Sequence, residues 1–135
     1  MTTLGLNYGE RRIGLAISQS GIVAQGWGRL PNLRGKEIAR IGAICQQHQV
    51  SKIVVGLPRS LNNLALGPAA QIVKKYGQQL EQELHLPVYF EDETLTTNEA
   101  ENNLRALGWN QAKIASKIDE ESAKLILQSY IDRQK

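Results

Sequence analysis

The sequence predicts an α/β domain, and three observations lead to this fold class. Apolar residues alternate with small or polar ones on both sides of a short turn within residues 3–18, a pattern typical of a β-hairpin. Residues 52–56 form a continuous apolar run, which is typical of a strand covered by helices on both faces. Apolar residues recur at helical spacings of three and four in the segments that follow. These patterns indicate a sheet with packed helices.

Length and composition favour one folded domain over residues 1–135. The 135 residues fit a single core, and 41% hydrophobic against 21% charged residues is typical of a globular protein rather than a disordered tail or a fibre. The one cysteine, Cys45, excludes an intramolecular disulfide and suits a reducing compartment. No apolar run approaches the roughly 20 residues needed to cross a bilayer, and the first residues lack a signal-peptide pattern. We therefore predict a cytoplasmic protein with no membrane partner.

The hairpin of residues 3–18 is the element on which we expect a site. Its two apolar runs meet at a polar turn over residues 8–12, and Asn7 lies at the mouth of this turn. Gly5 and Gly14 lie inside the strands, where glycine weakens pairing and is usually kept only where another backbone, a helix or a ligand comes close. The hairpin is therefore predicted to form the floor of a site.

A third strand and a first helix follow the hairpin. Residues 22–30 read as a strand that completes an antiparallel meander. The apolar period then changes, with Ile38, Ile41 and Ile44 on one stripe, so a helix is expected over residues 36–48.

After the buried strand, the chain alternates between helix and strand. A helix is predicted over residues 67–86 and a strand over residues 88–91. Thr96 and Glu99 have the spacing of a capping box, which predicts a helix that stops at Gly108. The helix over residues 67–86 is expected to turn five apolar side chains inward: Ile72, Val73, Tyr76, Leu80 and Leu84.

Residues 109–116 are expected to connect to a final helix. Its inward stripe is predicted to comprise Ser122, Ala123, Ile126, Leu127, Tyr130 and Ile131. Asp119 precedes Ala123 by four residues and falls on the same stripe. This is an unusual place for a carboxylate unless another group pairs with it.

The charge distribution permits nucleic-acid binding without demanding it. The net charge is +3 and the pI is about 9.1, with basic residues concentrated in the first half and acidic residues later. A basic face beside carboxylates suits an enzyme that binds a phosphate backbone and holds a metal ion against it. The alternative interpretation is that these charges are scattered over a solvated surface. Arg11, Arg12 and Arg59 flank the predicted site and are candidates for phosphate binding, with surface solubility as the alternative.

Four segments, in order along nearly the whole chain, form a recognisable set. They are GLNYG with RIG at residues 5–14, VVGLP at 54–58, DETLTT at 92–97, and ID at 118–119 followed by ILQSY at 126–130. Together they resemble the pre-16S rRNA nuclease family, also called Holliday-junction-resolvase-like, of the ribonuclease-H-like superfamily. The resemblance implies a mixed five-stranded sheet, with three antiparallel strands extended by parallel strands and helices on both faces.

The same resemblance implies a metal-dependent endonuclease that processes the 5′ end of precursor 16S ribosomal RNA during ribosome biogenesis. Asn7, Glu93 and Asp119 fall where the family has catalytic Asp, Glu and Asp, which implies that they hold Mg²⁺ or Mn²⁺. This chain departs from the family at Asn7 and at Thr94, where the family has arginine. An amide oxygen can touch a cation but carries no charge, so Asn7 is expected to lower metal affinity and impair activity. Asp92 is expected to point away from Glu93, because side chains alternate along an extended chain.

Each of these positions also has a purely structural interpretation. Asn7 could simply begin the turn, Glu93 could be favoured by a helix dipole, and Asp119 could cap a helix N-terminus. Two other functions stay open as well: a Holliday-junction resolvase, which would cut branched DNA as a symmetric dimer, and a catalytically inactive nucleic-acid-binding module of the same fold. The expected partner is structured RNA or branched DNA, and the expected state is a monomer or weak homodimer.

Overall fold

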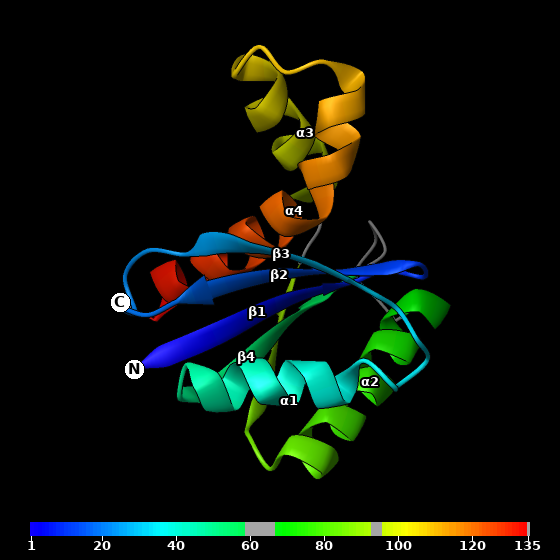
Figure 1. The fold of residues 1–135 in the computed structure, drawn as a ribbon, viewed down its shortest axis with the longest axis vertical. Helices are drawn as coiled ribbons and strands as arrows, with labels where there is room; N and C mark the ends of the chain where they lie inside the picture. Colours follow the sequence, from blue (N-terminus) through cyan, green and yellow to red (C-terminus); the bar gives the residue numbers. More distant parts are fainter. Residues whose placement is uncertain (59–66, 93–95, 135) are drawn as a thin grey trace.

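A computed structural model describes residues 1–58, 67–92 and 96–134 of the chain, with the side chains of residues 96–98 left out (Figure 1). Strands and helices follow the predicted order βββαβαβαα. The elements are β1 (Thr2–Tyr8), β2 (Arg12–Ser18), β3 (Gln25–Pro31), α1 (Ile38–Gln47), β4 (Val50–Leu57), α2 (Pro68–Leu84), β5 (Val88–Asp92), α3 (Thr96–Ala106) and α4 (Gln111–Arg133). Within this described part, no helix combines the length and the apolar character that crossing a bilayer requires.

The five strands form one mixed sheet in the order β3-β2-β1-β4-β5. β1 pairs antiparallel with β2, and β2 pairs antiparallel with β3. On the other side, β1 pairs parallel with β4, and β4 pairs parallel with β5. The predicted sheet, an antiparallel meander extended by parallel strands, is therefore confirmed. β1 lies at its centre, so the end of β1 that carries Asn7 is flanked by strands on both sides.

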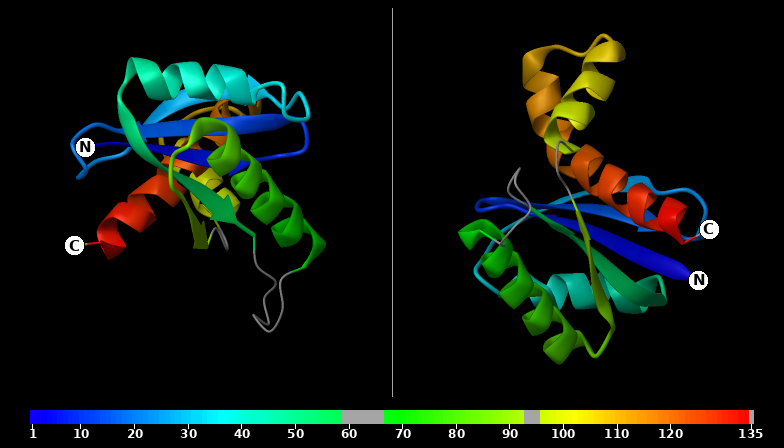
Figure 2. Two further views of the ribbon diagram at one scale, coloured as in Figure 1. Left: turned by 90° about the horizontal axis from the view of Figure 1, so that it is seen from below. Right: turned by 180° about the vertical axis from the view of Figure 1, so that it is seen from behind.

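Helices cover both faces of the sheet, as predicted (Figure 2). Alternation along each strand sends Leu4 and Leu6 of β1 toward α1 and α2, where they join the larger apolar core. The opposite face packs against α4 through a second core that includes Ala16 and Val54 of the sheet and Leu127 of the helix. The sheet is thus the central layer between α1 and α2 on one side and α4 on the other.

Helix α4 is longer than the sequence analysis expected. It begins at Gln111, so the predicted connection over residues 109–116 is wrong for most of its length. Asn110 caps it, because the Asn110 side chain accepts a hydrogen bond from the Lys113 backbone N–H at 2.9 Å. The first turns of α4 pack beside α3 in a helical hairpin that stands away from the sheet, whereas the later turns lie across the sheet (Figures 1 and 2).

The third strand begins later than predicted, at Gln25 rather than residue 22. Ile22 and Val23 are exposed, and the Ser20 hydroxyl accepts hydrogen bonds from both of their backbone N–H groups. The Gln128 side chain also donates to the Ile22 carbonyl at 2.9 Å. Side chains therefore satisfy the backbone here, and these residues do not need a strand partner.

Ile72 was predicted to face inward on α2, but its side chain is 55% exposed. The buried stripe instead runs through Ala70, Val73, Tyr76, Gly77 and Leu80. Ile72 sits about 100° around the helix from Val73, and Gly77 lies close to the sheet, because a Cβ placed on it would lie 2.5 Å from Cζ of Phe90 in β5. A rule based on apolar residues alone misassigned the stripe, because the closest contacts use small side chains.

Candidate active site

Asn7 lies near the carboxyl end of β1 on the face of the sheet covered by α4. Side chains alternate along a strand, so Asn7 shares a face with Gly5. A Cβ placed on Gly5 would lie 2.8 Å from Cβ of Leu127 in α4, which identifies this face. Asn7 is half-buried and pairs across the sheet with Gly14 of β2. Its side chain is therefore directed to the side from which α4 approaches.

Gly14 allows α4 to approach the sheet beside Asn7. A Cβ placed on Gly14 would lie 2.0 Å from the carbonyl oxygen of Asp119 and 2.4 Å from its carbonyl carbon. The backbone of Asp119 therefore rests on the glycine that is the cross-strand partner of Asn7. Two site residues predicted from distant parts of the sequence, Asn7 and Asp119, come together in this way. The predicted close approach at Gly5 and Gly14 is confirmed, and the approaching element is α4.

Two arginines converge on the Asp119 carboxylate. Nε of Arg12 donates a hydrogen bond to Oδ2 of Asp119 at 2.8 Å, and a terminal nitrogen of Arg29 lies 3.5 Å from the same oxygen. The Asp119 side chain is 20% exposed, while the arginine side chains are 45% and 39% exposed. Asp119 lies well inside α4, so the alternative that it is a helix N-cap is wrong, since Asn110 has that role. The partner expected for an inward carboxylate is thus a pair of guanidinium groups.

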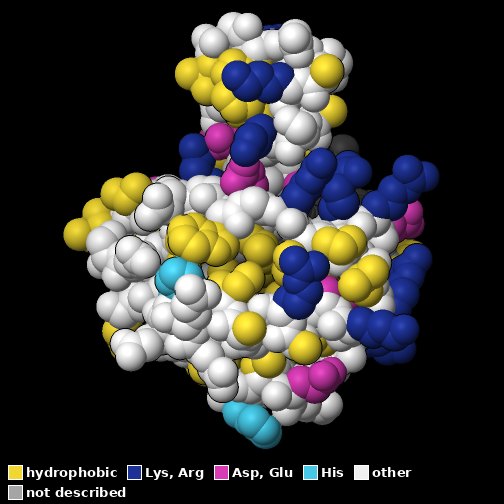
Figure 3. Space-filling model, viewed as in Figure 1, with side chains coloured by type: hydrophobic (Ala, Val, Ile, Leu, Met, Phe, Trp, Pro, Cys, Tyr) yellow, Lys and Arg dark blue, Asp and Glu magenta, His cyan; other side chains and the backbone are white. Residues whose placement is uncertain are grey.

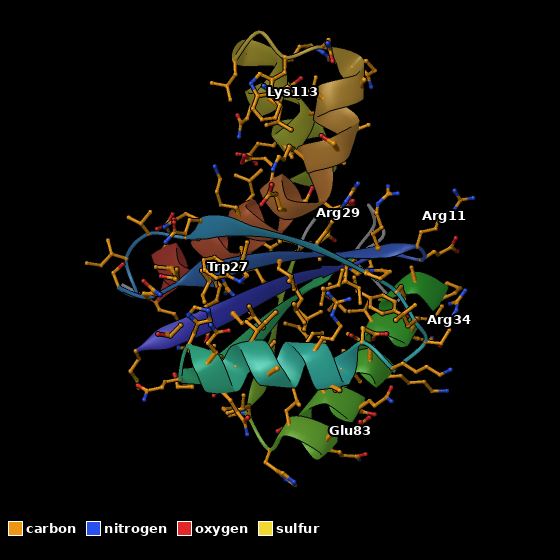
Figure 4. All side chains as sticks on the ribbon, viewed as in Figure 1. Arg11, Trp27, Arg29, Arg34, Glu83 and Lys113 are labelled. Atoms are coloured by element: carbon orange, nitrogen blue, oxygen red, sulfur yellow. The ribbon has the colours of Figure 1, made fainter. Side chains whose placement is uncertain are left out.

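The turn between β1 and β2 presents Arg11 and Arg12 at the edge of this site. The Gly9 N–H donates to the Arg12 carbonyl at 2.9 Å, and the Asn32 N–H donates to the Arg11 carbonyl at 2.8 Å. The Asn32 side chain donates to the Gly9 carbonyl at 2.7 Å, so the start of the β3–α1 loop holds the turn. Lys and Arg side chains gather on this side of the molecule, where Arg11 and Arg34 project outward (Figures 3 and 4).

Sequence reasoning missed Arg29 as a member of the site. Arg29 pairs with Gly14, which pairs with Asn7, so the three residues form one row across β1, β2 and β3. The signal that could have found it is the strand register. That register was hidden because the β2–β3 ladder is irregular between Gly14 and Ala16.

Two predicted site residues, Glu93 and Arg59, lie outside the described residues. Asp92, the last residue of β5, is exposed, whereas Glu91 before it is 4% exposed. The Glu91 carboxylate accepts a hydrogen bond from the Ser129 hydroxyl at 2.8 Å and pairs with Arg133, both on α4. Glu91 therefore fastens α4 to the edge of the sheet, and Asp92 points the other way, because side chains alternate.

Trp27 and Trp109 each contact another side chain of the chain, and Figure 4 labels Trp27 and Lys113. Trp27 makes an edge contact with His48, with ring centroids 4.9 Å apart, and the Lys113 ammonium lies 4.1 Å from the Trp109 ring centroid. These contacts supply a structural role for each ring.

A buried carboxylate that sequence reasoning also missed supports the end of β1 from the opposite face. Glu37 is fully buried, and its carboxylate accepts hydrogen bonds from the backbone N–H groups of Leu33 and Gly35 and from the Tyr76 hydroxyl at 2.7 Å. The Tyr76 ring in turn contacts Tyr8, with centroids 4.3 Å apart. Burial alone raises the pKa of Glu37, but the hydrogen bonds from Tyr76 and the backbone outweigh it and lower the pKa below 4.5.

We expect Glu37→Gln to lower the free energy of unfolding at pH 7 by about 1 to 3 kcal/mol, because the substitution removes charge-assisted hydrogen bonds from a buried network. The folded-state pKa of Glu37 is the lower one, so its contribution is present above the unfolded pKa and is lost as pH falls through the folded pKa. The difference from wild type should therefore shrink below pH 4.5. Urea unfolding of wild type and Glu37→Gln at pH 7 and pH 4 measures this difference in the free energy of unfolding. Glu10→Gln, an exposed change in the β1–β2 turn, should show neither effect.

Comparison with known proteins covers nearly the whole chain. A family model described as "RuvX: Holliday junction resolvase" matches residues 1–133. A protein of Caldanaerobacter subterraneus subsp. tengcongensis named "Putative pre-16S rRNA nuclease" is 40% identical over 141 residues, covering 100% of this chain and 99% of the relative. A protein of Levilactobacillus brevis with the same name is 41% identical over 138 residues, covering 98% of this chain and 94% of the relative.

Solved structures show the same fold at low sequence identity. RuvC of T. thermophilus in complex with a Holliday junction substrate has a TM-score of 0.60 at 13% identity, covering 99% of this chain and 96% of that chain. The yeast mitochondrial Holliday junction resolvase Ydc2 has a TM-score of 0.52 at 12% identity, covering 98% of this chain and 78% of that chain. The predicted ribonuclease-H-like fold is thus confirmed in its RuvC-like form. The family model over residues 1–133, and the 40% and 41% identity to the two curated relatives, establish that the chain belongs to the RuvX family.

Proposed function

We propose that this chain is a metal-dependent endonuclease that processes the 5′ end of precursor 16S ribosomal RNA. The observation that carries the proposal is the meeting of Asn7 and Asp119 at the carboxyl end of the central strand, beside Arg12. Ligands commonly bind at this edge of α/β sheets. The curated relatives are named as pre-16S rRNA nucleases, which supplies the substrate of the proposal.

The oxygen donors at this site fit Mg²⁺ or Mn²⁺. Asn7 offers an amide oxygen and Asp119 a carboxylate, which are the hard ligands these cations take. Among the described residues no three His, Cys, Asp or Glu side chains form a metal-binding group, so the set proposed here is Asn7 and Asp119 with Glu93 from outside the described residues. When bound, the cation would activate the attacking water and neutralise the charge on the leaving oxygen.

The other residues of the proposed site position Asp119 and bind the phosphates of the substrate. The α4 backbone rests on Gly14, which fixes Asp119 beside Asn7. Arg11 and Arg12 project from a turn held by Asn32 and are proposed to bind the phosphates on either side of the cleaved bond, with Arg59 as a further contact. Because Asn7 is neutral where the family has aspartate, we propose that this chain holds its cation weakly and cuts slowly.

We expect the chain to cut a 5′-extended precursor 16S fragment in the presence of Mn²⁺, and Asp119→Asn to abolish the cleavage, because the substitution removes the only charged ligand among the described donors. RNA binding should survive in the variant and weaken as salt rises, since phosphate contacts depend on the arginines. Gel analysis measures cleavage and filter binding measures affinity. Asp132→Asn, on the same helix, is the matched control and should cut like wild type. Equal cleavage by Asp119→Asn and wild type would refute the proposal.

Branched DNA is the second candidate substrate. The matching family model is described as a Holliday junction resolvase, which favours it. A resolvase must cut two strands symmetrically and therefore requires a dimer, whereas a ribonuclease of this size can act as a monomer or weak homodimer. Light scattering at working concentration, with cleavage of a four-way junction measured beside the RNA assay, separates the two. Binding of both substrates with cleavage of neither would favour an inactive binding module.

A further inference from the structure

The ion pairs at Asp119 involve the oxygen donor that the proposed function needs for a cation. Oδ2 of Asp119 accepts from Arg12 at 2.8 Å and lies 3.5 Å from Arg29. The two guanidinium groups come from different strands, Arg12 from the start of β2 and Arg29 from β3. A carboxylate that already pairs with two arginines is a weaker ligand, because a cation bound to either of its oxygens is repelled by the nearby guanidinium charges.

The strand register explains why both arginines reach this oxygen. Asn7, Gly14 and Arg29 lie in one row across the sheet, and Arg12 is two residues from Gly14 on the same face of β2. Asp119 rests on Gly14 in the middle of the row. Asn7 and Arg29 therefore lie on either side of Gly14, the glycine on which the Asp119 backbone rests.

Both guanidinium groups are free to change partners. The side chains of Arg12 and Arg29 are 45% and 39% exposed, so each can turn to a ligand in solvent without unpacking a core. Arginine also matches the geometry of a phosphate as well as that of a carboxylate. An RNA phosphate at this edge would be the natural second partner for them.

We propose that Arg12 and Arg29 exchange partners at the active site, and that Arg29 is a phosphate-binding residue of the enzyme. In the free chain both neutralise Asp119. When RNA arrives they turn to its phosphate, and Asp119 becomes available to a divalent cation. Cation binding and RNA binding then favour each other, because each compensates the charge that the other leaves unpaired. This inference rests on the proposed function, since it takes Asp119 as a cation ligand.

The test measures Mn²⁺ affinity by electron paramagnetic resonance of the free ion, without RNA. Arg12→Gln and Arg29→Gln should each bind Mn²⁺ about fivefold more tightly than wild type, because a competitor for Asp119 is gone. Arg29→Lys keeps a positive charge and should stay near wild type. Arg40→Gln, an exposed arginine on α1 across the sheet, makes the same change in net charge and should leave the affinity unchanged. Unchanged or weaker Mn²⁺ binding in both Gln variants would overturn the exchange.

A second measurement examines the coupling between Mn²⁺ binding and RNA binding. Adding the precursor RNA, checked on a gel for intact strands, should tighten Mn²⁺ binding to wild type about fivefold or more and should do so much less in Arg29→Gln. Equal tightening in the two proteins would overturn the exchange.

Asp119→Asn separates failure of this inference from failure of the proposed function. If Asp119→Asn loses Mn²⁺ affinity while Arg12→Gln and Arg29→Gln gain none, only the proposed exchange of partners fails. If Asp119→Asn binds Mn²⁺ like wild type, Asp119 is no ligand and both proposals fail.

Discussion

Gly14→Ala is expected to lower the free energy of unfolding by about 3 kcal/mol, a large cost for one added methyl group. The new Cβ would lie 2.0 Å from the carbonyl oxygen of Asp119 and 2.4 Å from its carbonyl carbon. Both atoms belong to the backbone of α4 and cannot swing aside as a side chain would. The helix must therefore move away from β2 at the point where it carries Asp119, and the contact between Arg12 and Asp119 should be lost with it.

Urea unfolding measures the cost, and Gly67→Ala is the matched control. Gly67 has an ordinary negative φ of −71°, and a Cβ built on it meets nothing within 4 Å among the described residues. Gly67 is the N-cap of α2, so alanine there should cost only the difference between two N-cap residues, about 1 kcal/mol or less. Cleavage of the precursor RNA should fall in Gly14→Ala even under conditions where the protein stays folded. If Gly14→Ala unfolds at the same urea concentration as Gly67→Ala, the described approach of α4 to β2 is wrong.

Much of this fold was predictable because apolar periodicity records which side chains face a core. The alternation of the hairpin and the continuous apolar run of residues 52–56 became the three central strands β1, β2 and β4. Gly5 and Gly14 were equally informative, since glycine inside a strand predicts close approach of another element, and α4 makes that approach at both. Local sequence patterns were enough to predict a strand or helix wherever the element had a clearly defined buried face.

Errors arose where side chains outside the local pattern decide the structure. Ile22 and Val23 have strand-like side chains, yet Ser20 and Gln128 satisfy their backbone in a loop. Glu37 falls inside the helix expected over residues 36–48, but it lies just before α1, where the Tyr76 hydroxyl and loop amides enclose its carboxylate. In each case one deciding partner, Gln128 or Tyr76, comes from a distant element whose position no single stretch of sequence reveals.

The site was predictable only in part. Asn7 and Asp119 have no shared local motif, so their pairing came from family resemblance, and the structure now places them on adjacent elements. Arg29 was missed because its place depends on a strand register containing an irregularity. The catalytic roles of Asn7, Glu93 and Asp119, and the phosphate-binding role of Arg59, stay predictions; Glu93 and Arg59 lie outside the described residues.

Asn7→Asp is expected to raise the rate of cleavage in Mg²⁺ or Mn²⁺ by about tenfold or more, which corresponds to roughly 1.4 kcal/mol in the barrier. The substitution adds a negative ligand beside Asp119, where a cation must be held against a phosphate, and it barely changes the size of the side chain. The added carboxylate should also tighten Mn²⁺ binding, and a ligand that binds the folded chain more tightly stabilises it more. The variant should therefore also gain more in melting temperature from added Mn²⁺ than wild type does.

The partners of Asn7 supply the decisive comparison. In the Asn7→Asp background, Asp119→Asn or Glu93→Gln should remove the gain in rate, because each takes away a negative ligand that the cation needs. Asn102→Asp makes the same chemical change at an exposed position on α3 and should leave both the rate and the response to Mn²⁺ as in wild type. If Asn7→Asp binds metal and folds normally but cuts neither precursor ribosomal RNA nor branched DNA faster than wild type, the nuclease assignment must be abandoned, and a nucleic-acid-binding role becomes the better account of the basic face around Arg11 and Arg12.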